Sequence, residues 1–189
     1  MKMKKIYTIM MMAMMAMAFT SCEDEYIADT LEGTWSGNMY ISSYWDGRYY
    51  DASSTEVTFL RDPFTWTSGT GYWVDYYRNA PWGSYVANHI NWTVSNGTIF
   101  VHFIEDNDRI EIRDFRLSHN RFVGNIYDGD QLVEFDLYNV SRPYDYWDGY
   151  NWGYDYWYDS YYGYWARTRG AGNDSITVEK PKRVIRPAK

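Results

Sequence analysis

Three histidines are the side chains best suited to acid–base chemistry near neutral pH, but their positions assemble no catalytic group. We expect His89 on the outward face of a strand, His102 in a core or barrel lining, and His119 in a turn. An acidic cluster falls at an expected hairpin tip, where carboxylates are usually solvated: Glu105, Asp106, Asp108 and Glu111. The sequence motifs of serine hydrolases, zinc proteases, phosphate loops and dinucleotide sites do not occur. The sequence therefore predicts a non-enzymatic protein without a metal or cofactor.

The single cysteine, Cys22, ends a segment organised like a secretory signal peptide. Lysines at positions 2, 4 and 5 precede an apolar run over residues 9–19, and Thr20 and Ser21 supply small residues before Cys22. The apolar run is too short for a membrane-spanning helix, which needs about 20 residues. One cysteine also excludes a disulfide framework. Residues 1–21 are therefore predicted to be a signal peptide.

The junction at Cys22 resembles the lipobox of bacterial lipoproteins, in which the cysteine becomes the new N-terminus and its thiol is diacylated with fatty acids such as palmitate. The alternative is a core cysteine beside a conventional cleavage site. Glu23, Asp24 and Glu25 follow and resemble the surface-export signal of Bacteroidetes lipoproteins, although they also suit a solvated linker. The resemblance implies a lipoprotein anchored in the outer membrane and exposed on the cell surface, because several acyl chains hold a protein stably on a bilayer. Residues 22–30 are expected to be an acidic tether.

The charge is unevenly distributed along the predicted mature chain. Without the three signal lysines, 15 basic residues face 25 acidic ones, a net charge of −10. Such a chain repels phosphate polyanions, so nucleic acid is not an expected partner. Residues 166–189 are the basic exception, and we expect them to form a disordered, solvated tail. The alternative is that this tail touches anionic lipid headgroups or the acidic body.

Residues 31–140 alternate apolar and polar side chains with period 2, which is typical of strands. Asn96-Gly97 is a strong hairpin signal, and the short loops elsewhere require antiparallel neighbours. The apolar face shifts along residues 109–117, which predicts a bulge near Arg113-Asp114. We predict an all-β domain, a small antiparallel up-and-down barrel of about eight strands. The expected strands are 34–41, 55–60, 64–67, 71–76, 87–94, 98–104, 109–117, 121–127 and 131–140.

The first expected strand opens with Leu31-Glu-Gly33-Thr-Trp35, which resembles the G-x-W motif of lipocalins. Residues 68–71, 90–97 and 110–117 are similar in order and spacing to the lipocalin-like domain of Bacteroidetes lipoproteins. The resemblance implies a lipocalin-like barrel, closed at one end by Gly33 and Trp35, that binds a small apolar molecule. Four aromatic residues are predicted to point inward, either lining such a ligand or simply filling the barrel: Trp92, Phe100, Phe122 and Phe135.

Aromatic residues make up 21% of the chain and concentrate in residues 144–165, where 13 of 22 are Tyr or Trp. This low-complexity segment, within residues 141–165, contains a ten-residue repeat and no Leu, Ile or Val. Four alternatives remain open: glycan binding by ring stacking, self-association or adhesion, packing over the barrel, and calcium binding through Asp145, Asp148, Asp155 and Asp159. The candidate binding surface is Tyr146, Trp147, Trp152, Tyr156, Trp157 and Trp165.

Two tripeptides resemble the O-glycosylation motif of Bacteroidetes proteins, an Asp followed by Ser or Thr and an apolar residue. They place candidate acceptors at Thr30 and Ser175. Both positions are expected in linkers that flank the folded domain, where a transferase could reach them.

Overall fold

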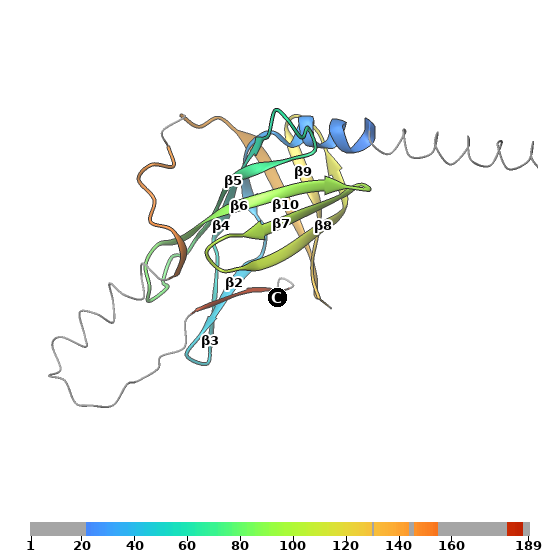
Figure 1. Ribbon diagram of the computed structural model, residues 1–189. Helices are drawn as coiled ribbons and strands as arrows, with labels where there is room; N and C mark the ends of the chain where they lie inside the picture. Colours follow the sequence, from blue (N-terminus) through green and yellow to red (C-terminus); the bar gives the residue numbers. More distant parts are fainter. Residues whose placement is uncertain (1–21, 130, 144–145, 155–180, 187–189) are drawn as a thin grey trace, which may run out of the picture.

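Eight antiparallel strands close into one barrel in the computed structural model, which describes residues 22–129, 131–143, 146–154 and 181–186 (Figure 1). The order around the barrel is β1-β10-β9-β8-β7-β6-β5-β4, so barrel strands that follow one another in the chain lie side by side, and β10 closes the barrel against β1. The predicted up-and-down barrel is confirmed. The barrel strands are β1 (Gly33–Asn38), β4 (Ser54–Arg61), β5 (Ser68–Tyr76), β6 (Tyr85–Ser95), β7 (Thr98–Phe103), β8 (Asp108–Leu117), β9 (Arg121–Asp128) and β10 (Gln131–Val140).

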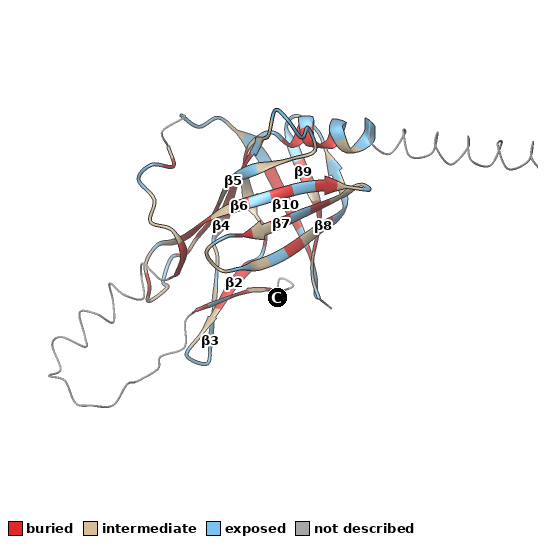
Figure 2. Cartoon of the chain, viewed as in Figure 1, coloured by how far each residue is buried: buried red, intermediate tan, exposed pale blue. Residues whose placement is uncertain are grey.

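Period-2 alternation builds the core, as buried and exposed positions alternate along the strands in Figure 2. The β6–β7 hairpin turns through Asn96 and Gly97 with φ angles of 51° and 71°, the left-handed conformation that this dipeptide favours. The bulge is also confirmed, because the β8–β9 register shifts between Arg113 and Arg116 and Asp114 has a φ of 48°.

A second, three-stranded sheet in the order β11-β2-β3 lies at one end of the barrel (Figure 1). It consists of β2 (Ile41–Trp45), β3 (Arg48–Asp51) and β11 (Lys182–Ile185). The predicted strand 34–41 is too long, because Tyr40 has a φ of 52° and divides it into β1 and β2. The prediction of a disordered tail is wrong for residues 182–185, which pair with β2. The predicted strand 64–67 is a turn instead.

Residues 22–31, which include the expected acidic tether, form a helix. Ile27, Ala28 and Leu31 share one helical face and are buried in the same core as the barrel strands. The indole Nε1 of Trp35 donates a 2.8 Å hydrogen bond to the Leu31 carbonyl at the end of the helix. The helix therefore closes one end of the barrel, with Trp35 beneath it.

Candidate functional site

Three of the four predicted lining residues, Trp92, Phe122 and Phe135, lie fully buried inside the barrel. The rings of Phe122 and Phe135 meet edge to face at 4.8 Å, and Trp92 meets Phe59 at 5.6 Å. Trp35 lies 5.7 Å from Phe122. These side chains pack against one another, so the part of the barrel interior that they occupy is filled by the protein's own rings.

The end of the barrel opposite the helix is closed by a polar network around Arg183 of β11. The guanidinium of Arg183 donates to Asp75 Oδ2 at 3.1 Å, Asp106 Oδ2 at 2.7 Å and Asn88 Oδ1 at 2.6 Å. It lies 4.1 Å above the Phe103 ring. The other oxygen of Asp75 accepts from Trp73 Nε1 and Thr55 Oγ1.

Arg183 and Asp75 are both buried, so the charges of this network depend on one another. Burial opposes the charge on Arg183, but Asp75 and Asp106 raise its pKa above the ordinary value. Burial raises the pKa of Asp106, an effect that Arg183 opposes. The guanidinium therefore remains charged and is held in place by both carboxylates.

Phe100 is on the outside of the barrel, 39% exposed, so the prediction that it faces inward is wrong. His102 is on the same outward face, which also corrects its expected place in the barrel lining. The inward residues of β7 are Ile99, Val101 and Phe103. The two-residue turn pairs Ser95 with Thr98, so Val94 pairs with Ile99 and both point to the same side of the sheet. Since Val94 was expected to face inward, the turn already indicated that Ile99 faces inward and Phe100 outward.

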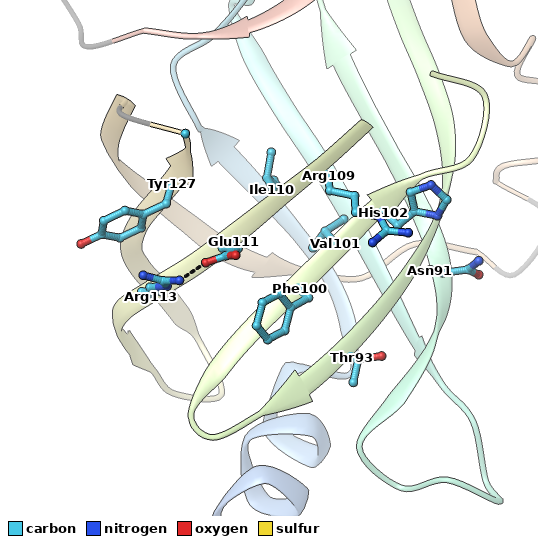
Figure 3. A pocket seen from close by; sticks show the side chains of 11 residues that line it. Asn91, Thr93, Phe100, Val101, His102, Arg109, Ile110, Glu111, Arg113 and Tyr127 are labelled. Carbon is cyan, nitrogen blue, oxygen red and sulfur yellow. Dashed lines mark hydrogen bonds and ion pairs between the residues drawn. The ribbon is translucent and has the colours of Figure 1, made fainter. Parts of the chain in front are cut away.

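Phe100 lines an open groove of about 600 Å³ on the outer face of β6 to β9. The side chains that line it, drawn in Figure 3, come from β6, β7, β8 and β9. Most of this set could not be recognised from the sequence, because polar side chains on an outward strand face resemble an ordinary solvated surface. The polar and aromatic members of the lining are Asn91, Thr93, Phe100, His102, Arg109, Glu111, Arg113 and Tyr127.

Polar contacts hold one wall of the groove. Arg113 pairs with Glu111, as the dashed line in Figure 3 marks, and its guanidinium lies 5.2 Å from the centre of the Tyr127 ring. The Tyr127 hydroxyl donates a 2.7 Å hydrogen bond to Asp114 at the bulge. The bulge therefore helps to fix the tyrosine at the edge of the groove.

Residues 146–154 pack on the outer face of β5 and β6, which agrees with the packing alternative for this part of the aromatic repeat. Trp147 is buried and stacks on Tyr72 with ring centres 5.3 Å apart. The rings of Trp152 and His89 are 3.9 Å apart, and Nδ1 of His89 lies 2.6 Å from Glu105 Oε1. The candidate residue Tyr146 is half-buried in the same cluster. The candidates Tyr156, Trp157 and Trp165 lie outside the described residues.

The N-terminal candidates lie on the helix. Cys22 and Glu23 are exposed at its beginning, while the Asp24 carboxylate accepts hydrogen bonds from the backbone amides of Asn96 (2.9 Å) and Gly97 (2.8 Å). Thr30 is buried and donates to the Tyr26 carbonyl at 2.9 Å, so its expected place in an accessible linker is wrong. Ser175 lies outside the described residues, and within the described ranges no helix is long and apolar enough to cross a membrane.

Among the residues that the structure describes, no group of three or more His, Cys, Asp or Glu side chains could hold a metal ion. His119 is exposed in the turn between β8 and β9, as predicted. His89 and Glu105 bring an imidazole and a carboxylate together, but the Trp152 ring lies against the imidazole.

The closed meander of eight strands, with a Gly-x-Trp motif at one capped end, defines a small lipocalin-type barrel. Residues 31–124 match the family model of the lipocalin-like domain, so the barrel is a lipocalin-like domain. Such domains are typically non-enzymatic binders. No curated protein matches the sequence.

Two solved structures are distantly similar to the chain. A lipocalin-like protein from Bacteroides uniformis is 13% identical, and the match covers 59% of this chain and 99% of that one with a TM-score of 0.36. A redesigned β-barrel is also 13% identical, with coverages of 61% and 95% and a TM-score of 0.37.

Proposed function

We propose that this protein is a non-enzymatic, lipid-anchored binding protein of the cell surface, and that it binds a glycan in the groove on the outside of β6 to β9. The observation that carries the proposal is the position of Phe100, exposed in a groove of about 600 Å³, while the other predicted lining rings fill the interior. Ligand sites are usually concave, with apolar surface and a few convergent polar groups. This description fits the outside of the barrel better than its inside.

The groove offers both kinds of contact that a sugar requires. The rings of Phe100 and Tyr127 provide flat apolar faces for the C–H side of a pyranose. The side chains of Asn91, Glu111 and Arg113 provide donors and acceptors for its hydroxyls. Because the groove is open along the sheet, it suits a segment of an extended polysaccharide.

Affinity electrophoresis through gels that contain soluble neutral or uronic-acid polysaccharides tests this proposal. We expect at least one polysaccharide to retard the wild-type protein, and Phe100→Ala to weaken that binding about tenfold, which corresponds to about 1.4 kcal/mol. Leu132→Ala is the matched control, because Leu132 is an exposed apolar residue of β10 that does not line the groove. Binding by Phe100→Ala that equals the control would contradict the proposal. Deleting residues 155–165 tests separately whether the rest of the aromatic repeat mediates adhesion or self-association.

A small apolar ligand inside the barrel is the second candidate, and the match to the lipocalin-like domain favours it. Such a ligand would have to displace packed rings such as Trp92, Phe122 and Phe135 and pass one of the closed ends. A fatty acid that binds there should raise the melting temperature, because it binds only the folded state. The rise should be larger in Trp92→Ala, which frees space inside the barrel, and unchanged in Phe100→Ala, which alters only the outer face.

The lipid anchor is tested by replacing the predicted acylated residue. We expect Cys22→Ser to move the protein out of the outer-membrane fraction, because a chain without acyl groups lacks the hydrophobic anchor. Digestion of intact cells by an external protease distinguishes the cell surface from the periplasmic face of the membrane. Retention of Cys22→Ser in the membrane fraction would contradict the anchor.

A further inference from the structure

The loop between β4 and β5 presents two large rings to solvent. Phe64 is 88% exposed and Trp66 is 54% exposed, and Leu60 next to the loop is 40% exposed. On the neighbouring helix, Tyr26 is 66% exposed. Exposed apolar side chains gathered on one part of a surface indicate a binding partner or a membrane.

Hydrogen bonds hold the loop in this conformation. The Asp62 carboxylate accepts from the amide of Phe64 at 2.8 Å, and the Asp62 carbonyl accepts from the amide of Trp66 at 3.2 Å. Thr65 and Ser68 share a hydroxyl–hydroxyl bond of 2.6 Å. The backbone of Trp66 has a φ of 63°, an uncommon conformation outside glycine. The rings are therefore displayed by an ordered turn.

The same end of the barrel carries Cys22. Arg61, the last residue of β4, forms ion pairs with Asp29 at 3.0 Å and Glu32 at 3.3 Å, which join the base of the loop to the end of the helix. The helix begins at Cys22, ten residues before Glu32, and at 1.5 Å per residue this separation corresponds to about 15 Å along the helix axis. Figure 1 shows the helix and the β4–β5 loop at one end of the molecule and the β2–β3 hairpin at the other.

We infer that this end of the barrel rests on the lipid bilayer, with Phe64 and Trp66 inserted at the level of the headgroups beside the acyl chains of Cys22. The inference rests on the proposed lipid anchor. Tryptophan prefers the interface because its indole combines an apolar body with a polar N–H, while Phe64 reaches the acyl boundary.

The charge of this end selects the type of lipid. Glu23 is exposed at the beginning of the helix, and Asp29 near its end and Glu32 just after it both pair with Arg61. An acidic surface is repelled by anionic lipids, so the fitting partner is a zwitterionic bilayer. The acyl chains then retain the protein, and the two rings fix its orientation. In this orientation the β2–β3 hairpin points away from the membrane.

Spin labels on an introduced cysteine test the inference in the full lipoprotein, reconstituted in phosphatidylcholine vesicles. Thr65→Cys places a label between the two rings and keeps both, while Arg48→Cys places one on the exposed β2–β3 hairpin as the control. Power saturation measures the access of oxygen, which concentrates in lipid, and of a water-soluble nickel chelate. We expect the label at residue 65 to shift toward oxygen and away from the chelate relative to the label at residue 48. Adding Phe64→Ser and Trp66→Ser to Thr65→Cys should abolish the shift.

Labelling of the wild-type protein distinguishes failure of the lipid anchor from failure of the inference about Phe64 and Trp66. If Cys22 is acylated, the wild-type protein takes up no label; uptake would overturn the lipid anchor and, with it, the placement of this end on the bilayer. If the wild type stays unlabelled but the labels at residues 65 and 48 are equally accessible to the chelate, the anchor stands and the inference about Phe64 and Trp66 is wrong. Equal melting temperatures of the variants exclude an effect of misfolding.

Discussion

The barrel is closed at both ends, but the two closures use opposite chemistry. At the helix end, the apolar side chains of Ile27, Ala28 and Leu31 are buried in the barrel core. At the arginine end, Arg183 is buried among Asp75, Asp106 and Asn88. Apolar closure depends on volume, whereas polar closure depends on the presence of every partner, because a buried charge without its counter-charge is very unfavourable.

Replacing Arg183 should give the largest loss of stability in the molecule. Arg183→Ala leaves the buried carboxylate of Asp75 without its counter-charge, so we expect the free energy of unfolding to fall by about 3–5 kcal/mol. Urea denaturation followed by tryptophan fluorescence measures this loss. Arg186→Ala is the matched control on the same strand region, since Arg186 pairs with the exposed Asp51 and should contribute less than about 1 kcal/mol. Equal losses for the two variants would show that the buried network is not the main closure.

At the helix end, size should matter more than identity. Leu31→Ala removes a fully buried side chain and should cost about 3 kcal/mol, whereas Leu31→Met keeps the volume and should cost less than about 1.5 kcal/mol. Arg183→Lys is the corresponding conservative change at the arginine end. Lysine cannot reproduce the three directed hydrogen bonds of the guanidinium, so Arg183→Lys should also lower the free energy of unfolding substantially. If Leu31→Met is as harmful as Leu31→Ala, the contrast between the two ends does not hold.

The sequence predicted the features that depend on local alternation. The eight barrel strands, the Asn96-Gly97 turn and the bulge near Asp114 all follow from patterns within a few residues. Phe100 was misplaced because both faces of β7 carry apolar residues, so alternation alone did not choose between them. The register of the preceding turn was the missing constraint.

The arginine end could not be predicted, because its partners are far apart in the chain. Arg183 meets Asp75, Asn88 and Asp106 across separations of 108, 95 and 77 residues. Its surroundings in the sequence are basic and contain proline, a composition typical of solvated tails. Among candidate site residues, the outer groove was missed for a related reason, since its polar residues resemble any outward strand face.

Alkaline pH should weaken the arginine end in particular. Tyr154 is buried there with its hydroxyl bonded to Ser43, and burial raises its pKa to about 12, against the opposing effect of Arg183. The unfolded chain loses this proton near pH 10, so the stability contribution is fully present below pH 10 and is lost as the pH rises toward 12. We expect a loss of about 1.4 kcal/mol at pH 11 that reaches about 2 kcal/mol near pH 12. Urea titrations at pH 9, 10 and 11 measure it, and Tyr154→Phe should show a smaller pH dependence than wild type.

The smallest effect is expected at Asp24, where the helix end meets the β6–β7 turn. Asp24→Ala removes the carboxylate that accepts two backbone hydrogen bonds, from Asn96 and Gly97, and should lower the free energy of unfolding by about 1 kcal/mol. Glu23→Ala is the control, because Glu23 is its exposed acidic neighbour. If urea denaturation finds both variants equal to wild type, Asp24 has no measurable structural role. A loss confined to Asp24→Ala would show that Asp24 stabilises the β6–β7 turn, because a turn cap needs one carboxylate at a fixed position and an acidic neighbour cannot replace it.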